Sequence, residues 1–264
     1  MVVEPEVDFE YKENSAQPLV VKPPLDIHPQ ISILKNFLIF ILGFAGLDIV
    51  GIIAGQLLIA FSGLPAEALP DFVISTPFLS NYNIIRYSVV AIFMAFLLAK
   101  DFTKFVPQLK RFMPYFKGLT YGVLLVIVSV SYGLFLDVIG VSSTDNANQT
   151  AVINLVKTYP LISAIWIPFL GPIIEELTYR LGLFDGIRKW NKIAAYVAVA
   201  LVFGLIHFDY TSANLVNELL ALPSYVLAGL LLSYVYEKEG IVASSVAHIF
   251  NNLFSFIQIV FLIS

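Results

Sequence analysis

Apolar runs of about membrane length recur along this chain. A helix that crosses a lipid bilayer needs about 20 mostly apolar residues. Such helices are predicted at Phe37–Phe61, Ile84–Ala99, Gly118–Gly140, Ile193–Phe208, Leu215–Tyr236 and Ile241–Ile263. Hydrophobic residues make up 58% of the chain and charged residues 13%, which is far less charge than soluble proteins carry. The pattern predicts an all-α, polytopic transmembrane bundle, and therefore an integral, multi-pass membrane protein in contact with the lipid bilayer.

One apolar segment is interrupted by prolines. Thr158–Ile174 contains Pro160, Pro168 and Pro172. Proline lacks the backbone N–H that a helix interior needs, but it suits the first helical position. We therefore expect a helix to restart near Pro172 and to run to about Lys189. The bundle then has seven to eight helices, depending on how this break is counted.

The beginning of the chain differs in composition from the rest. Residues 1–32 carry six acidic side chains, two lysines and five prolines, which favour an extended, solvated segment. We expect an acidic, proline-containing tail at 1–32 and the transmembrane bundle at 33–264. The net charge of −4, without a basic stripe, argues against a nucleic-acid partner. The chain has no cysteine, so disulfides and thiolate chemistry are excluded.

Basic residues are unevenly distributed between the loops. Ser62–Asn83 contains no Lys or Arg, whereas Lys100–Lys117 contains five and Arg188–Lys192 is basic again. Cytoplasmic loops are enriched in Lys and Arg. This asymmetry predicts that the N-terminus, and with it the tail at 1–32, is cytoplasmic.

Ionisable side chains inside the apolar runs are few and grouped. Such groups are costly within the hydrocarbon and usually mark function. They lie in three short motifs, which contain Glu175, Glu176 and Arg180, then Phe203 and His207, then His248 and Asn252. Residues four apart are neighbours on a helix surface. Glu176 is therefore expected to pair with Arg180, and His248 to share a face with Asn252.

Helical geometry separates the two adjacent glutamates. Consecutive residues point about 100° apart, so Glu175 is left free to face a cavity when Glu176 is occupied by Arg180. Glu175 and His207 are also about equally far from the turn at Lys189–Lys192, which places them at similar depth in antiparallel helices. His248 lies near the start of its helix and reaches the same depth only if that helix is tilted or offset.

The three motifs, in this order and each in its own apolar segment, resemble the CPBP family. This is the CAAX-protease and bacteriocin-processing (Abi) family of intramembrane proteases, which includes the Ras-converting CAAX endopeptidases. The resemblance covers about Pro160–Ser264, and it implies a protease-like core at 160–264. It implies an intramembrane endopeptidase in a prokaryotic plasma membrane. The substrate would be a CAAX-like, bacteriocin-related or other membrane-associated peptide or a membrane protein.

The resemblance also implies a role for each matched residue. Glu175 and His207 would activate a water molecule, and His248 and Asn252 would stabilise the oxyanion that forms. Glu176, Arg180 and Phe203 would support the site. This division agrees with general chemistry, because peptide hydrolysis needs a base near its working pH and preorganised donors where negative charge develops.

The cofactor question stays open at the level of sequence. Family members are often named metalloproteases, and Glu175, His207 and His248 are the residues that could ligate a divalent metal such as zinc. The chain has no His-Glu-x-x-His motif on one helix. We favour a metal-free, glutamate-type mechanism, because a base and oxyanion donors are present without an ion.

Two other classes of function compete with the protease. A secondary transporter also uses proline-broken helices and intramembrane carboxylates, but the chain shows no convincing internal repeat. A non-proteolytic membrane regulator or immunity protein of the same family is the second alternative. It would have no need to bury four polar, catalyst-like side chains.

Overall fold

A computed structural model describes residues 27–141 and 146–263. Every regular element within these ranges is helical, and no strand occurs there, so the predicted all-α class is confirmed. The tail expected at 1–32 falls mostly on residues 1–26, which lie outside the described ranges.

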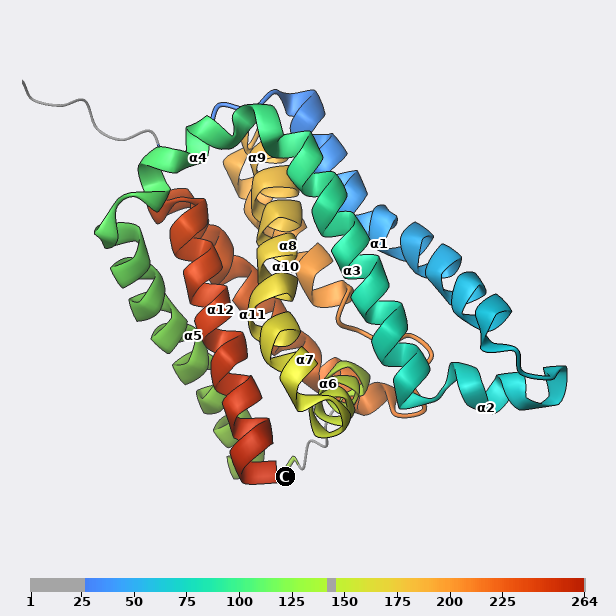
Figure 1. Cartoon of the computed structure of the whole chain (residues 1–264). Helices are drawn as coiled ribbons and strands as arrows, with labels where there is room; N and C mark the ends of the chain where they lie inside the picture. The colour runs from blue at the N-terminus through green and yellow to red at the C-terminus, as the bar shows by residue number, and fades with distance from the viewer. Residues whose placement is uncertain (1–26, 142–145, 264) are drawn as a thin grey trace, which may run out of the picture.

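Five helices in the described part of the chain are long and apolar enough to cross a bilayer (Figure 1). They are α1 (Ile33–Ser62), α5 (Phe112–Val138), the continuous helix Pro160–Arg188, α11 (Leu215–Glu239) and the helix that starts with α12 (Ile241–Gln258) and continues as η5 (Ile259–Ile263). The bundle also contains α3 (Thr76–Leu98) and the shorter apolar α10 (Lys192–Leu205). Short connecting helices are η1 (Ala66–Ala68), α2 (Leu69–Val73), η2 (Ala99–Asp101), α4 (Phe102–Leu109) and α6 (Ala147–Thr158).

Helix α3 differs from the expected span at Ile84–Ala99. It begins eight residues earlier, at Thr76, and it is not one of the five candidate membrane-spanning helices. Ser75 caps its N-terminus by accepting a hydrogen bond from the Phe78 N–H. The added residues 76–83 are polar and include two asparagines, and Arg86 follows shortly after them. Thr76, Ser80 and Asn83 from these residues line a cavity inside the bundle.

The proline-rich segment is one continuous helix rather than a break. It consists of α7 (Pro160–Ile165), the π-helical η3 (Trp166–Leu170), α8 (Gly171–Glu176), the π-helical η4 (Leu177–Phe184) and α9 (Asp185–Arg188). α-Helical geometry resumes at Gly171, close to the expected restart at Pro172. The preceding turn stays helical because its hydrogen bonds reach one residue further, as in the Gly171 N–H bond to the Trp166 carbonyl.

This wider register leaves one carbonyl without a backbone donor. The next hydrogen bond in the π-helical pattern would run from position 172 to the carbonyl of Ile167, but Pro172 has no N–H. The Ile167 carbonyl instead accepts a hydrogen bond from Asn252 Nδ2 at 3.3 Å. The proline therefore creates a polar attachment point between α8 and α12.

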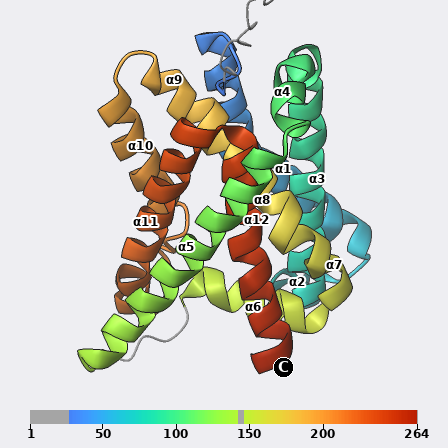
Figure 2. The same cartoon turned by 90° about the vertical axis from the view of Figure 1, so that its left-hand side faces the viewer.

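The continuous helix lies at the centre of the bundle. Its η4 segment packs against α1 and α10, while α8 and η3 pack against α12. Helix α12 is covered on its other side by α5, and α10 pairs with α11 (Figure 2). Many large apolar side chains remain exposed on the outer helices, such as Phe61 at 84% and Phe96 at 75%. A lipid bilayer would cover this surface.

Residues 27–32 cross one end of the bundle and join several helices. The Ile27 carbonyl accepts from Gln108 Nε2 at 2.8 Å, and the Gln30 carbonyl accepts from Lys104 Nζ at 2.6 Å. Lys189 Nζ donates to the carbonyl of Ile31. These contacts gather α1, α4 and the turn between α9 and α10 at the same end, where Figure 1 shows them together.

The close contact of η4 with α1 requires a glycine. A Cβ at Gly182 would lie 2.8 Å from the Phe40 backbone nitrogen, whereas a Cβ at Gly133 on α5 would meet nothing within 4 Å. Overpacking of this kind costs about 1–3 kcal/mol. We predict that Gly182→Ala lowers the thermal unfolding midpoint in detergent, while Gly133→Ala leaves it unchanged or raises it. Equal midpoints for the two variants would contradict this packing argument.

Candidate active site

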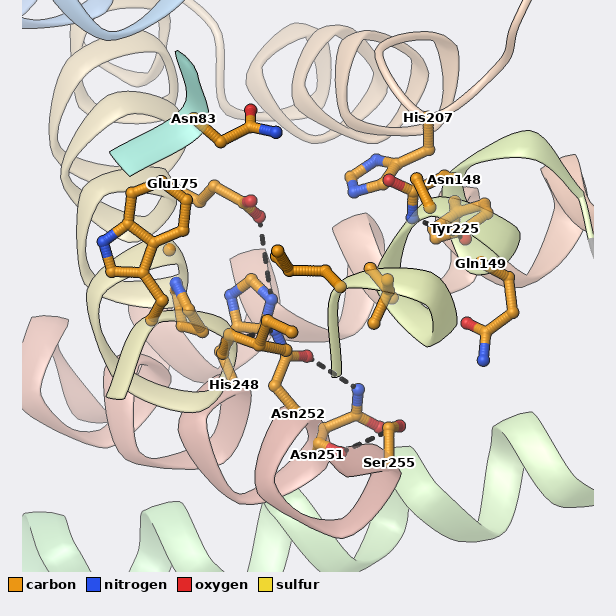
Figure 3. Close-up of a pocket in the computed structure, with 18 of the residues that line it drawn as sticks. Asn83, Asn148, Gln149, Glu175, His207, Tyr225, His248, Asn251, Asn252 and Ser255 are labelled. Carbon is orange, nitrogen blue, oxygen red and sulfur yellow. Dashed lines mark hydrogen bonds and ion pairs between the residues drawn. The ribbon is translucent and has the colours of Figure 1, made fainter. Parts of the chain in front are cut away.

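A cavity of about 590 Å³ opens inside the bundle, lined by residues of α3, α5, α6, α8, α11 and α12. Glu175, His207, His248 and Asn252 all line it, as Figure 3 shows. Among the described residues that line the cavity, Glu175 is the one carboxylate and Arg86 the one Lys or Arg. The structure thus brings the four predicted catalytic residues to one hollow, from three separate segments of the chain.

Glu176 faces the protein interior rather than the cavity. Its side chain is fully buried, and its Oε1 lies 3.2 Å from Arg180 Nη1. Arg180 is also fully buried. The same Oε1 lies 3.0 Å from His248 Nδ1, within hydrogen-bonding distance. The ion pair expected one turn apart on the helix is therefore present, and it holds His248 in addition.

Glu175 faces the cavity, one position before this ion pair. Its Oε2 lies 3.7 Å from His248 Nε2, and Figure 3 shows its carboxylate directed into the cavity. The sequence reasoning paired Glu175 with His207, whereas the imidazole that the structure brings within 4 Å is that of His248. The difference arises because α12 packs directly on α8, so His248 reaches the depth of Glu175.

His207 lies in the turn after α10. The predicted helix Ile193–Phe208 ends at Leu205, and His207 Nδ1 is 2.7 Å from the Phe203 carbonyl, to which it donates. The imidazole stacks on the Tyr225 ring with a centroid distance of 4.3 Å. These two contacts fix the ring plane and leave Nε2 as the nitrogen without this backbone bond.

The turn that carries His207 is held by Glu218 and Asn146. Glu218 accepts hydrogen bonds from the Asp209 and Ala147 backbone N–H groups at 3.1 and 2.8 Å. Asn146 caps the start of α6 and donates to the His207 carbonyl at 3.4 Å. Glu218 therefore joins the loop after α10 to the first turn of α6, and the position of His207 depends on both.

Phe203 packs at the centre of the polar residues. Its ring centroid is 4.9 Å from that of His207 and 5.8 Å from that of His248. The Arg180 guanidinium carbon lies 4.8 Å from the same centroid. An aromatic ring in this position attracts the cation and keeps the two imidazoles apart, which agrees with the predicted packing role.

Asn252 is oriented by two hydrogen bonds. Its Nδ2 donates to the Ile167 carbonyl, and its Oδ1 accepts from Asn251 Nδ2 at 3.3 Å. A carboxamide nitrogen carries two N–H groups. The second N–H of Asn252 is therefore available to a group bound in the cavity, next to His248 one turn earlier.

Arg86, Asn148 and Tyr225 are among the cavity residues that sequence reasoning missed. Arg86 carried a usable signal, because it is an ionisable residue in an apolar run. Tyr225 and Asn148 carried none. Their hydrogen bond, 3.1 Å from Asn148 Nδ2 to the Tyr225 hydroxyl, joins α6 to α11 across 77 positions of sequence.

The donor set does not fit a metal centre with three protein ligands. Within residues 27–141 and 146–263, no three His, Asp or Glu side chains are close enough to hold a metal ion. Glu175 Oε2 lies 3.7 Å from His248 Nε2, and His207 does not join them in such a group. The mechanism considered below therefore assigns no step to a metal.

Comparison with known proteins identifies the part of the chain that carries these motifs. Residues 157–254 match the family model described as type II CAAX prenyl endopeptidase Rce1-like. Over these residues the chain is similar to the Rce1-like family. The resemblance drawn from the three motifs is confirmed, since all seven motif residues lie in the matched range. The chain is an integral membrane protein whose residues 157–254 are similar to an endopeptidase family.

Two relatives extend beyond the matched range. UPF0177 protein YvdC of Lactococcus lactis subsp. lactis is 26% identical over 221 residues, which is 80% of this chain and 81% of that protein. An uncharacterized protein of Mycoplasma capricolum subsp. capricolum is 22% identical over 68% of this chain and 56% of its own length. No solved structure matches the chain. The Rce1-like description is thus the comparison that bears on activity.

The Glu176–Arg180 pair predicts a large effect on stability. Glu176→Gln leaves the Arg180 charge buried without its counter-charge, and breaking such a pair costs about 3–5 kcal/mol. The half-exposed pair between Lys117 and Glu239 is a matched control, because exposed pairs contribute about 0–1 kcal/mol. We expect thermal unfolding in detergent to show a strongly lowered midpoint for Glu176→Gln and a near-unchanged one for Glu239→Gln. Similar midpoints would mean that Arg180 does not depend on Glu176.

Proposed function

We propose that this protein is an intramembrane endopeptidase that hydrolyses a peptide bond in the cavity between α8 and α12, with Glu175 as the general base. One observation carries the proposal. The Glu175 carboxylate faces a cavity among membrane-spanning helices, and two imidazoles and a carboxamide line the same cavity. The Rce1-like match supports the same activity.

Glu175 and His207 are proposed to activate the attacking water. Neutral His207 that donates its Nδ1 proton to the Phe203 carbonyl has an unprotonated Nε2, which can accept a proton. As the water oxygen bonds to the substrate carbonyl carbon, its proton passes to Glu175 or His207. The same proton then goes to the leaving amine as the carbon–nitrogen bond breaks.

His248 and Asn252 are proposed to stabilise the oxyanion. Oxyanion binding requires a proton on His248 Nε2, while Nδ1 donates to Glu176. The proposed donor is thus an imidazolium whose counter-charge is Glu176, itself held by Arg180. Asn252 supplies its second N–H from the next turn of α12. Such preorganised donors contribute most where water is largely excluded.

Glu176 is therefore a positioning residue in this proposal. It touches no substrate, because it is fully buried behind the cavity wall. Its contacts determine the orientation of His248 and, through Arg180 and Phe203, the spacing of both imidazoles.

The proposed location is a prokaryotic plasma membrane with a cytoplasmic N-terminus. Supporting this orientation, Arg188–Lys192 lies at the same end of the bundle as residues 27–32 and α4, where Lys189 and Lys104 bind the backbone of Ile31 and Gln30. The basic segments Lys100–Lys117 and Arg188–Lys192 thus meet at one end of the bundle, which supports a cytoplasmic position for both. The proposed substrate is a CAAX-like or other membrane-associated peptide.

Glu175→Gln separates the base from the scaffold. The substitution preserves shape and removes the base, so cleavage should fall at least about 100-fold, while the thermal midpoint stays near that of the wild type. The assay is release of the C-terminal tripeptide from a short peptide with S-farnesyl-cysteine fourth from its C-terminus, followed by mass spectrometry in detergent. Full activity in Glu175→Gln would overturn the mechanism.

Asn252→Ala tests the oxyanion site with the same assay. Loss of one such donor lowers kcat by about 100- to 1,000-fold with little change in KM. Asn251→Ala is the matched control: Asn251 also lines the cavity, but its proposed role is limited to its hydrogen bond to Asn252, so the effect should be several-fold at most. The non-proteolytic alternative makes two different predictions. The wild-type protein would cut none of a set of membrane peptides, and the Glu175→Gln variant would still complement a strain that lacks the gene.

A further inference from the structure

Arg86 is a cation at the cavity wall that the proposed mechanism does not use. It lies on α3, in the middle of a membrane-length helix. Its Nε is fully buried and has no hydrogen-bond partner. In the described parts of the chain, Arg86 forms no ion pair, whereas the buried Arg180 and the partly buried Lys35 and Arg188 are each paired with a carboxylate. A guanidinium left without a counter-charge in such surroundings is costly.

The contacts of Arg86 are aromatic. Its guanidinium carbon lies 5.0 Å from the Tyr82 ring centroid and 5.3 Å from that of Tyr87. Tyr87 in turn contacts Trp166 of the continuous helix at 5.2 Å. Stacking on aromatic rings stabilises a guanidinium and restricts its orientation, yet it leaves the N–H groups at the edge free to donate. The two tyrosines therefore hold the cation without neutralising it.

Arg86 belongs to a polar face of α3 that is directed into the cavity. Thr76, Ser80, Asn83 and Tyr87 recur at helical spacing and line the same cavity. Figure 3 shows the Asn83 carboxamide pointing into the cavity, across from His207 and near Glu175. This face lies outside the Rce1-like match at 157–254. It forms a wall of the cavity distinct from the segments that carry the proposed chemistry.

We propose that Arg86 binds a carboxylate of the substrate peptide and so determines which peptides enter the cavity productively. A guanidinium matches a carboxylate through two parallel N–H···O bonds. A bound carboxylate would supply the counter-charge that the described chain lacks. Of the described residues that line the cavity, Glu175 is the only acidic one, and its carboxylate lies next to His248. The inference rests on the proposed function and specifies the substrate class as peptides with a carboxylate near the cleaved bond.

The carboxylate has two chemical sources, the C-terminus of the peptide and an acidic side chain. Binding to Glu175→Gln protein separates them, because this variant retains Arg86 and does not turn the peptide over. The probes are three fluorescent S-farnesyl-cysteine peptides: one with a free C-terminal carboxylate, one with a C-terminal amide, and one with the amide and a Glu after the cysteine. Fluorescence anisotropy in detergent gives the Kd of each.

We expect the amide without Glu to bind at least about tenfold more weakly than the free acid, in line with the strength of hydrogen bonds to charged groups. Adding Arg86→Gln should weaken the free acid by a similar factor and leave the amide unchanged. Recovery of affinity in the Glu-containing amide would identify a side chain as an acceptable source. Lys157→Gln, which removes an exposed cation outside the cavity, is the matched control and should change no Kd.

Equal affinities for the acid and both amides would overturn the inference, and this comparison needs no change at Arg86. The outcome is separable from that of the proposed function, because wild-type cleavage of the same peptides is measured in parallel. If the wild type cleaves the acid and the amide peptides equally well, the endopeptidase proposal stands and the proposed role of Arg86 is wrong. If binding depends on the carboxylate but the wild type cleaves none of the peptides, Arg86 is an anion-binding residue and the endopeptidase proposal is contradicted.

Discussion

The buried ion pair between Glu176 and Arg180 is the interaction on which the rest of the site depends. Two opposite charges one turn apart, both fully buried, can persist only where every neighbour is arranged around them. Phe203 lies against the guanidinium, and His248 binds the carboxylate. Three helices are therefore tied to one pair of charges, and the orientation of Glu175 follows because the adjacent position on the helix must point elsewhere.

Much of this arrangement could be predicted from the sequence, because it follows from local geometry. The apolar runs predicted the spans, and α5, α11 and α12 fall close to their expected positions. The four-residue spacing of Glu176 and Arg180 predicted their pairing, and hence the free face of Glu175. These inferences need only the period of a helix, which is the same wherever the helix lies in the fold.

The remaining features could not be predicted, because they depend on contacts between distant segments. The proximity of Glu175 to His248 results from the packing of α12 on α8, and the sequence carries no direct record of that packing. The continuity of Pro160–Arg188 depends on two π-helical segments. One of these exposes the Ile167 carbonyl to Asn252, 85 positions away. Pro172, which local sequence rules associate with a helix break, here leaves the Ile167 carbonyl free to accept a hydrogen bond from a distant helix.

The cavity combines two walls with different origins in the chain. The Rce1-like segment supplies the carboxylate, the imidazoles and the carboxamide, which are the groups that hydrolysis of any peptide bond would need. Helices α3 and α6 supply Arg86, Asn83 and Asn148, which have no place in that chemistry but face the same space. The residues of the first wall are fixed by a reaction that is the same for many substrates. The residues of the second wall are free to vary with the peptide that is bound. Selectivity in this protein is therefore best sought in the helices that precede the family match, where an arginine stacked on two tyrosines lines the same cavity as Glu175.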